Sequence, residues 1–208
     1  RFFSRKRKGD VYEKDDLIYA QGEPVLYTDE ILIPGGHNIE NYMAAIGATL
    51  GLVSSETIRK VAKTFGGVEH RIEFVRKVKG VSYYNSSIDS SPNRSKATLS
   101  VFPQKVIMIA GGKDKGIPYD DLGPVIGEHV KHLILIGATS DKIEGAVKQC
   151  GAQVPIYRCE TYEQAVNTGA RLAEEGDIVV LSPASTSFDM FRNFEERGNT
   201  FKEYVNRL

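Results

Sequence analysis

The sequence contains no tryptophan, only two cysteines and no long apolar run. Cys150 and Cys159 form neither a CxxC pair nor a disulfide framework, so we expect a reducing, cytoplasmic compartment. No signal peptide or membrane-spanning stretch is evident, so we expect no membrane partner. Lys plus Arg number 27 and Asp plus Glu number 27, so no basic excess exists to bind a nucleic acid. The basic run at residues 5–8 fits a solvated turn better than a nucleic-acid patch. Separately, we expect the protein to be a monomer.

Two domains suit a chain of 208 residues. The chain begins at Arg1 without an initiator Met, so we expect a fragment of a longer polypeptide. Residues 1–34 alternate apolar pieces at 17–19, 25–27 and 31–33 with turn signals, which predicts a small β-meander. Two helices are predicted over residues 38–65, the first capped by Asn38 and the second by Ser54 or Ser55. We place the domain boundary so that the domains are residues 1–68 and 69–208.

Strand and helix patterns alternate from Arg71 onward, which predicts a Rossmann-like, mostly parallel α/β sheet with helices on both faces. The two strands that flank Lys79 and Gly80 are expected to form a hairpin. The predicted strands lie near residues 72–78, 81–84, 105–110, 133–137, 154–158 and 178–181. The predicted helices lie near residues 93–102, 119–130, 141–149, 162–175 and 188–207.

Polar loops follow four of these strands, and in an open parallel sheet such loops emerge along one edge, where ligands bind. The Gly111–Gly116 loop offers Lys113 and Lys115 to an anion, although a plain tight turn is an equal alternative. Ser90 and Ser91 precede Pro92 at a predicted helix start, so they either bind an anion or cap the helix. These loops comprise residues 85–92, 111–116, 137–140 and 182–187.

The remaining polar candidates are less specific. Asn38 and Asn41 open a helix, where their amides either read a nucleotide base or act as caps. Arg71, at the domain junction, is suited to a bound phosphate or to a surface ion pair. His129 and His132 lack a third ligand nearby, so we expect no metal site. Residues alone therefore indicate an anion- or nucleotide-binding α/β domain.

Four stretches resemble motifs of the Mur ligases. Residues 37–45 match the pattern HN-x-x-N-x-x-AA, and residues 65–73 match F-x-G-x-x-HR-x-E. Residues 80–85 resemble the strand that precedes the family's Asn-Asp-Ser-Lys-Ala-Thr-Asn motif. Residues 181–198 look most like the members that join D-glutamate to UDP-N-acetylmuramoyl-L-alanine. The resemblance covers essentially the whole chain.

The resemblance implies ATP-dependent amide formation in peptidoglycan synthesis, and with it a role in cell shape and division. Family members phosphorylate the substrate carboxylate, and the amine of D-glutamate then attacks the acyl phosphate. Residues 1–68 would be the end of the central ATPase domain and residues 69–208 the domain that binds the amino acid. The resemblance assigns ATP contacts to Asn38, Asn41, Arg71, Ser86 and Asp89. It assigns D-glutamate contacts to Ser90, Lys115, Ser187, Phe188 and Phe194.

This sequence departs from the family motif at two positions, where Ser86 replaces an Asp and Ile88 replaces a Lys. Asp89 is the candidate to take over the ribose contact. The phosphate loop and the ligands of Mg²⁺ are not found in the chain, so we expect no catalytic residue here and no turnover by this fragment alone. Alternatives are a sibling ligase, folylpolyglutamate synthetase, or a stand-alone nucleotide- or anion-binding module.

Overall fold

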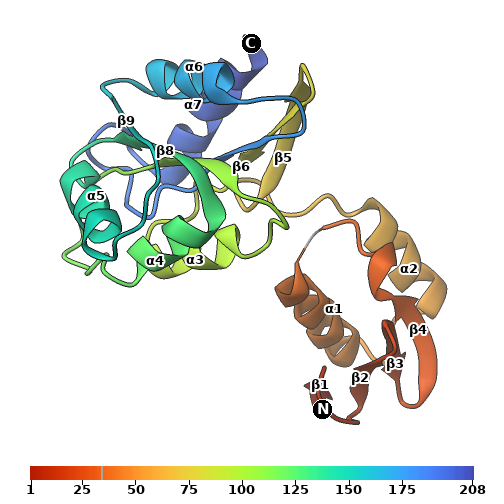
Figure 1. Cartoon of the computed structure of the whole chain (residues 1–208). Helices are drawn as coiled ribbons and strands as arrows, with labels where there is room; N and C mark the ends of the chain where they lie inside the picture. The colour runs from red at the N-terminus through yellow and green to blue at the C-terminus, as the bar shows by residue number, and fades with distance from the viewer. Residues whose placement is uncertain (34) are drawn as a thin grey trace. The chain divides into compact units, whose positions relative to one another are not determined.

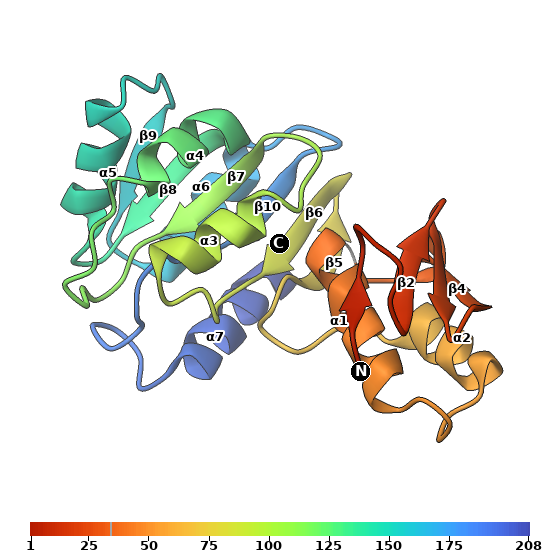
Figure 2. The same ribbon diagram turned by 90° about the horizontal axis from the view of Figure 1, so that it is seen from below.

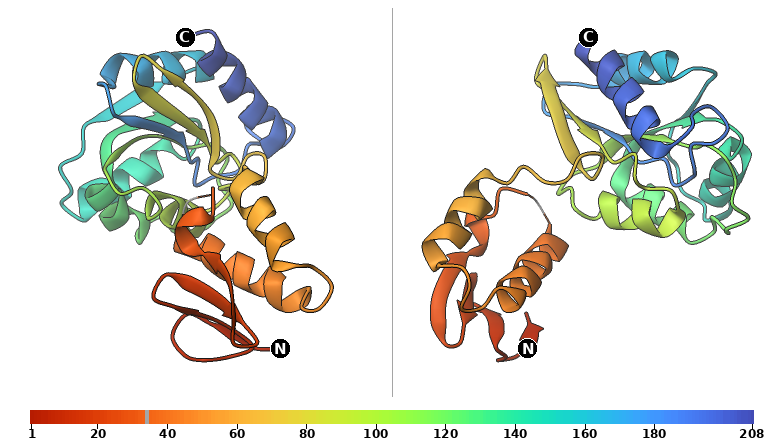
Figure 3. Two further views of the ribbon diagram at one scale, coloured as in Figure 1. Left: turned by 90° about the vertical axis from the view of Figure 1, so that its right-hand side faces the viewer. Right: turned by 180° about the vertical axis from the view of Figure 1, so that it is seen from behind.

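The computed structural model describes residues 1–33 and 35–208, which fold as two compact units, Arg1–Gly67 and Val68–Leu208. The first unit contains a four-stranded sheet in the order β1-β2-β3-β4, in which β2 to β4 are antiparallel, as predicted, and β1 is parallel to β2. Two helices lie on one side of this sheet (Figure 3). The elements are β1 (Phe3–Ser4), β2 (Val11–Lys14), β3 (Leu17–Ala20), β4 (Glu23–Tyr27), the 3₁₀ turn η1 (Thr28–Glu30), α1 (Gly36–Ala48) and α2 (Ser55–Thr64).

Two predictions for this unit were wrong. The strand expected at residues 31–33 does not form, because Ile31 N–H donates to Thr28 O at the end of a 3₁₀ turn. Helix α1 begins at Gly36 rather than after Asn38, and its cap residue Gly35 has a φ of 104°. Ser54 caps α2 as predicted, since its side chain accepts a hydrogen bond from Thr57 N–H.

The second unit is built on a six-stranded sheet in the order β5-β6-β10-β7-β8-β9. The edge strand β5 forms the predicted antiparallel hairpin with β6, and the other neighbours are all parallel. The Rossmann-like α/β prediction is confirmed (Figure 1). The strands are β5 (Glu73–Val78), β6 (Val81–Asn85), β7 (Val106–Ala110), β8 (Val130–Ile136), β9 (Ile156–Cys159) and β10 (Ile178–Leu181). The helices are α3 (Pro92–Leu99), α4 (Leu122–His129), α5 (Ser140–Gln149), α6 (Tyr162–Leu172) and α7 (Phe194–Asn206).

Both faces of this sheet are buried, which explains why its strands show no polar alternation. Met108 on β7 packs in a core with α3, α4 and α5, and the next residue, Ile109, packs in a second core with α6 and α7. Figure 2 shows α3 and α4 lying across one face of the strands. The helices therefore cover the faces and leave the carboxyl edge of the sheet to its loops.

Candidate functional site

The carboxyl ends of the parallel strands lie side by side at one edge of the sheet. Leu181, the last residue of β10, is in register with Asn85 at the end of β6 and with Ile109 near the end of β7. Ala110 of β7 is in register with Leu135 of β8. The four polar loops singled out in the sequence therefore start next to one another.

The loop after β7 is joined to the loop after β10 by main-chain hydrogen bonds. Lys113 N–H donates to Thr186 O at 2.8 Å, and Thr186 N–H donates back to Lys113 O at 3.2 Å. Gly112 makes this approach possible: its φ is 144°, and a Cβ there would lie 2.2 Å from Thr186 O. The lysine-bearing and serine-bearing segments thus form one structure.

Lys113 and Lys115 are exposed, and neither has an ion-pair partner within residues 1–33 and 35–208. The acidic residue of their loop, Asp114, is bound by Lys142 of α5 and accepts a hydrogen bond from Gly116 N–H at 2.8 Å. The hydrogen bond from Lys142 lowers the pKa of the Asp114 carboxyl, which therefore stays ionised and paired. The two loop lysines remain as uncompensated positive charges at the edge, a setting that attracts an anion.

The hydroxyls in the loop after β10 have different roles. Ser185 Oγ lies 2.8 Å from both Tyr119 Oη and Thr139 Oγ1, and Thr186 Oγ1 donates to Lys113 O. Ser187 Oγ has no hydrogen-bond partner in the described part of the chain. Ser187 is 3% exposed, but its hydroxyl is therefore the one of this segment that is not committed to a protein partner, and it lies next to the exposed residue Phe188.

The predicted start of the last helix was wrong. Helix α7 begins at Phe194 and not at Phe188, because Asn193 acts as its cap: Asn193 Oδ1 accepts a hydrogen bond from Glu196 N–H at 2.8 Å. Ser187 and Phe188 consequently lie in a loop, in which Ser187 O accepts hydrogen bonds from Met190 N–H and Phe191 N–H. The periodic phenylalanines suggested a longer helix than the cap permits.

A buried arginine joins the loops after β6 and β10; it belongs to the stretch 181–198 that carries the resemblance, but the sequence assigned it no role. Arg197 is 0% exposed, and burial lowers the pKa of its guanidinium. It donates to Ser87 O at 2.7 Å, to Ser87 Oγ at 3.0 Å and to Ser185 O at 2.9 Å. These bonds hold the serine-rich loop of residues 86–91 against the loop that carries Ser187. Its neighbours in α7 are charged and polar, such as Glu196 and Asn199, so the sequence gave no sign that this arginine is buried.

Ser90 lies in that serine-rich loop, half-buried, with its hydroxyl donating only to Ile88 O at 3.3 Å. Pro92 begins α3 as predicted, and Ser91 occupies the cap position without a side-chain hydrogen bond. Ser90 therefore keeps a polar group near the edge that the helix cap does not use.

Ser86 and Asp89 are turned into the domain. Ser182 Oγ donates to Asp89 at 2.7 Å, and Ser86 Oγ lies 3.2 Å from Thr98 Oγ1. Ser86 is 0% exposed and Asp89 is 3% exposed, and burial raises the pKa of the Asp89 carboxyl. Both side chains hold the loop to α3 and β10, and neither presents a surface that a ribose could touch in this conformation.

The stretch at the start of the second unit combines a buried histidine with an exposed arginine. His70 has a φ of 64°, its Nδ1 lies 2.9 Å from Asn85 Nδ2, and its ring meets Phe194 edge-on at 5.9 Å. Arg71 is exposed and has no ion pair among the residues that the structure describes. Phe194 is thus fixed at the start of α7, and Arg71 is available to an anion.

Glu69, His70 and Glu73 bring potential metal-ligand atoms within 4.8 Å of one another. Lys202 from α7 already binds both carboxylates, at 3.1 Å in the case of Glu73. Because the Lys202 ammonium group already pairs with both carboxylates, the cluster is not suited to a divalent cation.

In the first unit, Asn38 and Asn41 lie in the first turns of α1. Asn41 Nδ2 donates to Asn38 Oδ1 at 3.2 Å, so their amides are on one side of the helix, as predicted. Asn41 is exposed and Asn38 is half-buried. No helix in the described ranges combines the length and the apolar character needed to cross a bilayer.

Comparison with known proteins gives a consistent family. Residues 70–185 match the family described as Mur ligase, glutamate ligase domain. The chain is 53% identical to the UDP-N-acetylmuramoylalanine--D-glutamate ligase of Ruminiclostridium cellulolyticum and 52% identical to that of Acetivibrio thermocellus, over 100% of this chain and 47% of each relative. It therefore spans about half the length of the curated relatives it matches.

Solved structures support the fold. The UDP-N-acetylmuramate-alanine ligase of Thermotoga maritima matches with a TM-score of 0.70 at 14% identity, over 99% of this chain and 47% of that one. The folylpolyglutamate synthase of Mycobacterium tuberculosis complexed with ADP matches with a TM-score of 0.61 at 13% identity, over 90% of this chain and 44% of that one. The family match over more than half of the residues decides the classification: the chain belongs to the Mur ligase family, whose glutamate ligase domain it carries.

Proposed function

We propose that this chain is the carboxyl-terminal part of an ATP-dependent ligase that adds D-glutamate to UDP-N-acetylmuramoyl-L-alanine in peptidoglycan synthesis. The substrate carboxylate would be activated as an acyl phosphate, and the amine of D-glutamate would attack it. The names and the identity of the relatives support the substrates, and the edge described above supports the binding of an anionic amino acid.

One observation carries the proposal: the loop with Lys113 and Lys115 is hydrogen-bonded to the segment that ends in Ser187. D-Glutamate has two carboxylates, and an unpaired ammonium is the group that would hold one of them by a charge-assisted hydrogen bond. We assign this contact to Lys115, further polar contacts to Ser187 and Ser90, and apolar contacts to Phe188 and Phe194. An amine fixed in this way would meet the acyl phosphate without the entropic cost of a free encounter.

The nucleotide contacts follow from the remaining polar groups. We assign the adenine to Asn38 and Asn41 and the phosphates of ATP to Arg71, with residues 1–68 as the end of an ATPase domain and residues 69–208 as the amino-acid domain. Ser86 and Asp89 enter the proposal as residues that hold the loop, because the side chains of both are engaged in buried hydrogen bonds. Magnesium would accompany ATP, on ligands outside this chain.

A chimeric enzyme tests the proposal. The amino-terminal part of the Ruminiclostridium cellulolyticum relative would be joined to residues 1–208 in place of its own matching half, and phosphate release would be measured. We expect release that depends on ATP, UDP-N-acetylmuramoyl-L-alanine and D-glutamate, and none from the 208-residue chain alone.

Use of an acceptor other than D-glutamate would contradict the proposed substrate. A folded chimera that prefers L-lysine, L-alanine or a folate acceptor would show that the chain belongs to a sibling ligase with a different substrate. Turnover by the isolated chain would contradict the assignment of the catalytic groups to a preceding part of the polypeptide.

A further inference from the structure

Three buried hydroxyl groups from three different loops form a chain of hydrogen bonds behind the proposed amino-acid segment. Tyr119 Oη lies 2.8 Å from Ser185 Oγ, which lies 2.8 Å from Thr139 Oγ1. Tyr119 is 5% exposed, Ser185 2% and Thr139 0%, so water does not compete for these bonds. The three residues come from the loops after β7, β10 and β8 respectively.

Ser185 connects this hydroxyl cluster to the segment of Ser187 and Phe188. Its carbonyl accepts a hydrogen bond from buried Arg197 at 2.9 Å, and Ala184 before it has a φ of 55°, a left-handed conformation that costs energy for a residue with a Cβ. The contacts around Ser185 therefore maintain a turn that the backbone would not favour alone. Ser187 and Phe188 follow directly, so the geometry of this turn determines where they lie.

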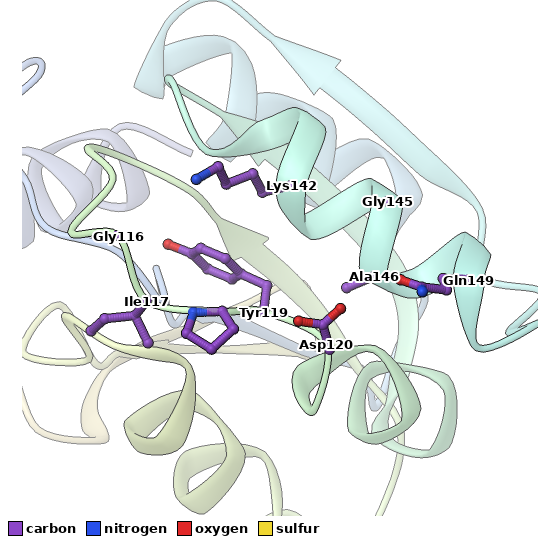
Figure 4. A pocket seen from close by; sticks show the side chains of 9 residues that line it. Gly116, Ile117, Tyr119, Asp120, Lys142, Gly145, Ala146 and Gln149 are labelled. Carbon is purple, nitrogen blue, oxygen red and sulfur yellow. The ribbon is translucent and has the colours of Figure 1, made fainter.

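Tyr119 lies in the same loop as Lys115, four residues further along the chain. Its ring packs in the core with α4 and α5. Residues 116–118 border an open cavity of about 370 Å³ on the α5 side, which Tyr119 and Lys142 also line. Figure 4 shows the Tyr119 side chain between this loop and Lys142. The buried contacts of Tyr119 therefore add to the Lys113–Thr186 main-chain hydrogen bonds that hold this loop.

We propose that Tyr119 is a positioning residue for the amino-acid substrate: its hydroxyl, acting through Ser185, fixes the segment of Ser187 and Phe188 relative to the loop of Lys115. The inference rests on the proposed function for the identity of the substrate. Burial raises the pKa of the Tyr119 hydroxyl, which stays protonated and able to donate at neutral pH.

The first test uses the 208-residue chain and needs no substrate. Tyr119→Phe removes one oxygen and keeps the ring, so we expect the melting temperature to change little while amide hydrogen exchange of residues 185–188 speeds up roughly fivefold, the worth of one neutral hydrogen bond. Tyr204→Phe is the control, because Tyr204 makes no side-chain hydrogen bond in the described ranges. Unchanged exchange at residues 185–188 in Tyr119→Phe would overturn the inference.

The second test uses the chimeric ligase. Tyr119→Phe should raise KM for D-glutamate roughly fivefold with KM for ATP unchanged, and Ser185→Ala should do the same. The double variant should be no worse than either single variant, because both interrupt one connection. Equal increases in KM for ATP and D-glutamate would indicate general loosening and would contradict a positioning role. A wild-type chimera that ignores D-glutamate would refute the proposed function, and the exchange measurement would still decide the role of Tyr119.

Discussion

At the scale of single residues, two buried ionisable side chains organise the edge, and neither has an oppositely charged partner within hydrogen-bond distance in the described part of the chain. Arg197 donates to two carbonyl groups and a hydroxyl, and Asp89 accepts from Ser182. A buried charge without a counter-ion costs free energy. Because Arg197 and Asp89 lie beside the loops, we infer that they maintain the loop geometry at some cost in stability.

Asp89→Asn tests the cost of the buried carboxylate. Because the pKa is raised in the folded state, ionisation of Asp89 penalises folding: the penalty is absent below the ordinary aspartate pKa of about 3.9 and grows as pH rises toward the folded value. The variant should therefore gain unfolding free energy relative to the wild type as pH rises from 3.5 to 7, measured by urea unfolding.

Asp114→Asn is the matched control with the opposite sign. Lys142 lowers the pKa of Asp114, so its stabilising contribution is present above the ordinary aspartate pKa and is lost as pH falls through the folded value. A pH-independent difference for Asp89→Asn would contradict this account of the buried carboxyl, because it would mean that the pKa of Asp89 is the same in the folded and unfolded states.

Arg197→Lys tests the three hydrogen bonds that the buried guanidinium group donates. A lysine keeps the charge but cannot reach three acceptors at once, so we expect a loss of about 3 kcal/mol of unfolding free energy. Arg192→Lys, at a side chain that is 88% exposed, should change stability by less than about 0.5 kcal/mol. Equal effects of the two substitutions would show that Arg197 does not tie the loops together.

At the scale of helices and strands, the sequence predicted the parallel sheet well because uninterrupted apolar runs such as residues 178–181 occur only where both faces are covered. It failed where a local hydrogen bond decides the outcome. The start of α7 depends on the Asn193 cap, and the periodic phenylalanines before it gave the wrong boundary. Likewise, Asn38 resembles a cap but lies inside α1.

Helices α4 and α5 offer a matched pair of glycines. A Cβ on Gly123 would lie 2.2 Å from Ala146 O, a backbone atom that cannot move aside, whereas a Cβ on Gly145 would meet nothing within 4 Å. Gly123→Ala should therefore cost roughly 1–3 kcal/mol, and Gly145→Ala should stabilise the protein by about 0.5–1 kcal/mol. Thermal unfolding of both variants checks this, and a neutral Gly123→Ala would refute close packing of the two helices.

At the scale of the whole molecule, the second unit has two cores of its own, one on each face of its sheet. We expect residues 68–208, expressed alone, to unfold cooperatively with a midpoint within about 2 °C of the corresponding transition in the full chain. Calorimetry would show this. A polypeptide without a cooperative transition would mean that the unit depends on residues 1–67.

Only some of the candidate binding residues, and of the contacts that position them, could be predicted from the sequence. The topology brings together the loops that carry Ser90, Lys115 and Ser187, which follows from the strand pattern. The tasks of Arg197 and Tyr119 depend on contacts between residues far apart in the chain, which no periodicity encodes. The burial of Asp89, which looked available to a ribose, has the same origin.

The most direct measurement is the dependence of phosphate release on D-glutamate concentration in the chimera and in its Lys115→Ala variant, with Lys142→Ala as a second lysine of the same region. Loss of one charge-assisted hydrogen bond to the substrate predicts a fall in kcat/KM for D-glutamate of roughly 10- to 100-fold for Lys115→Ala, with KM for ATP unchanged. Lys142→Ala should have a smaller effect, because that ammonium group pairs with Asp114. A Lys115→Ala enzyme that uses D-glutamate as well as the wild type would contradict the account.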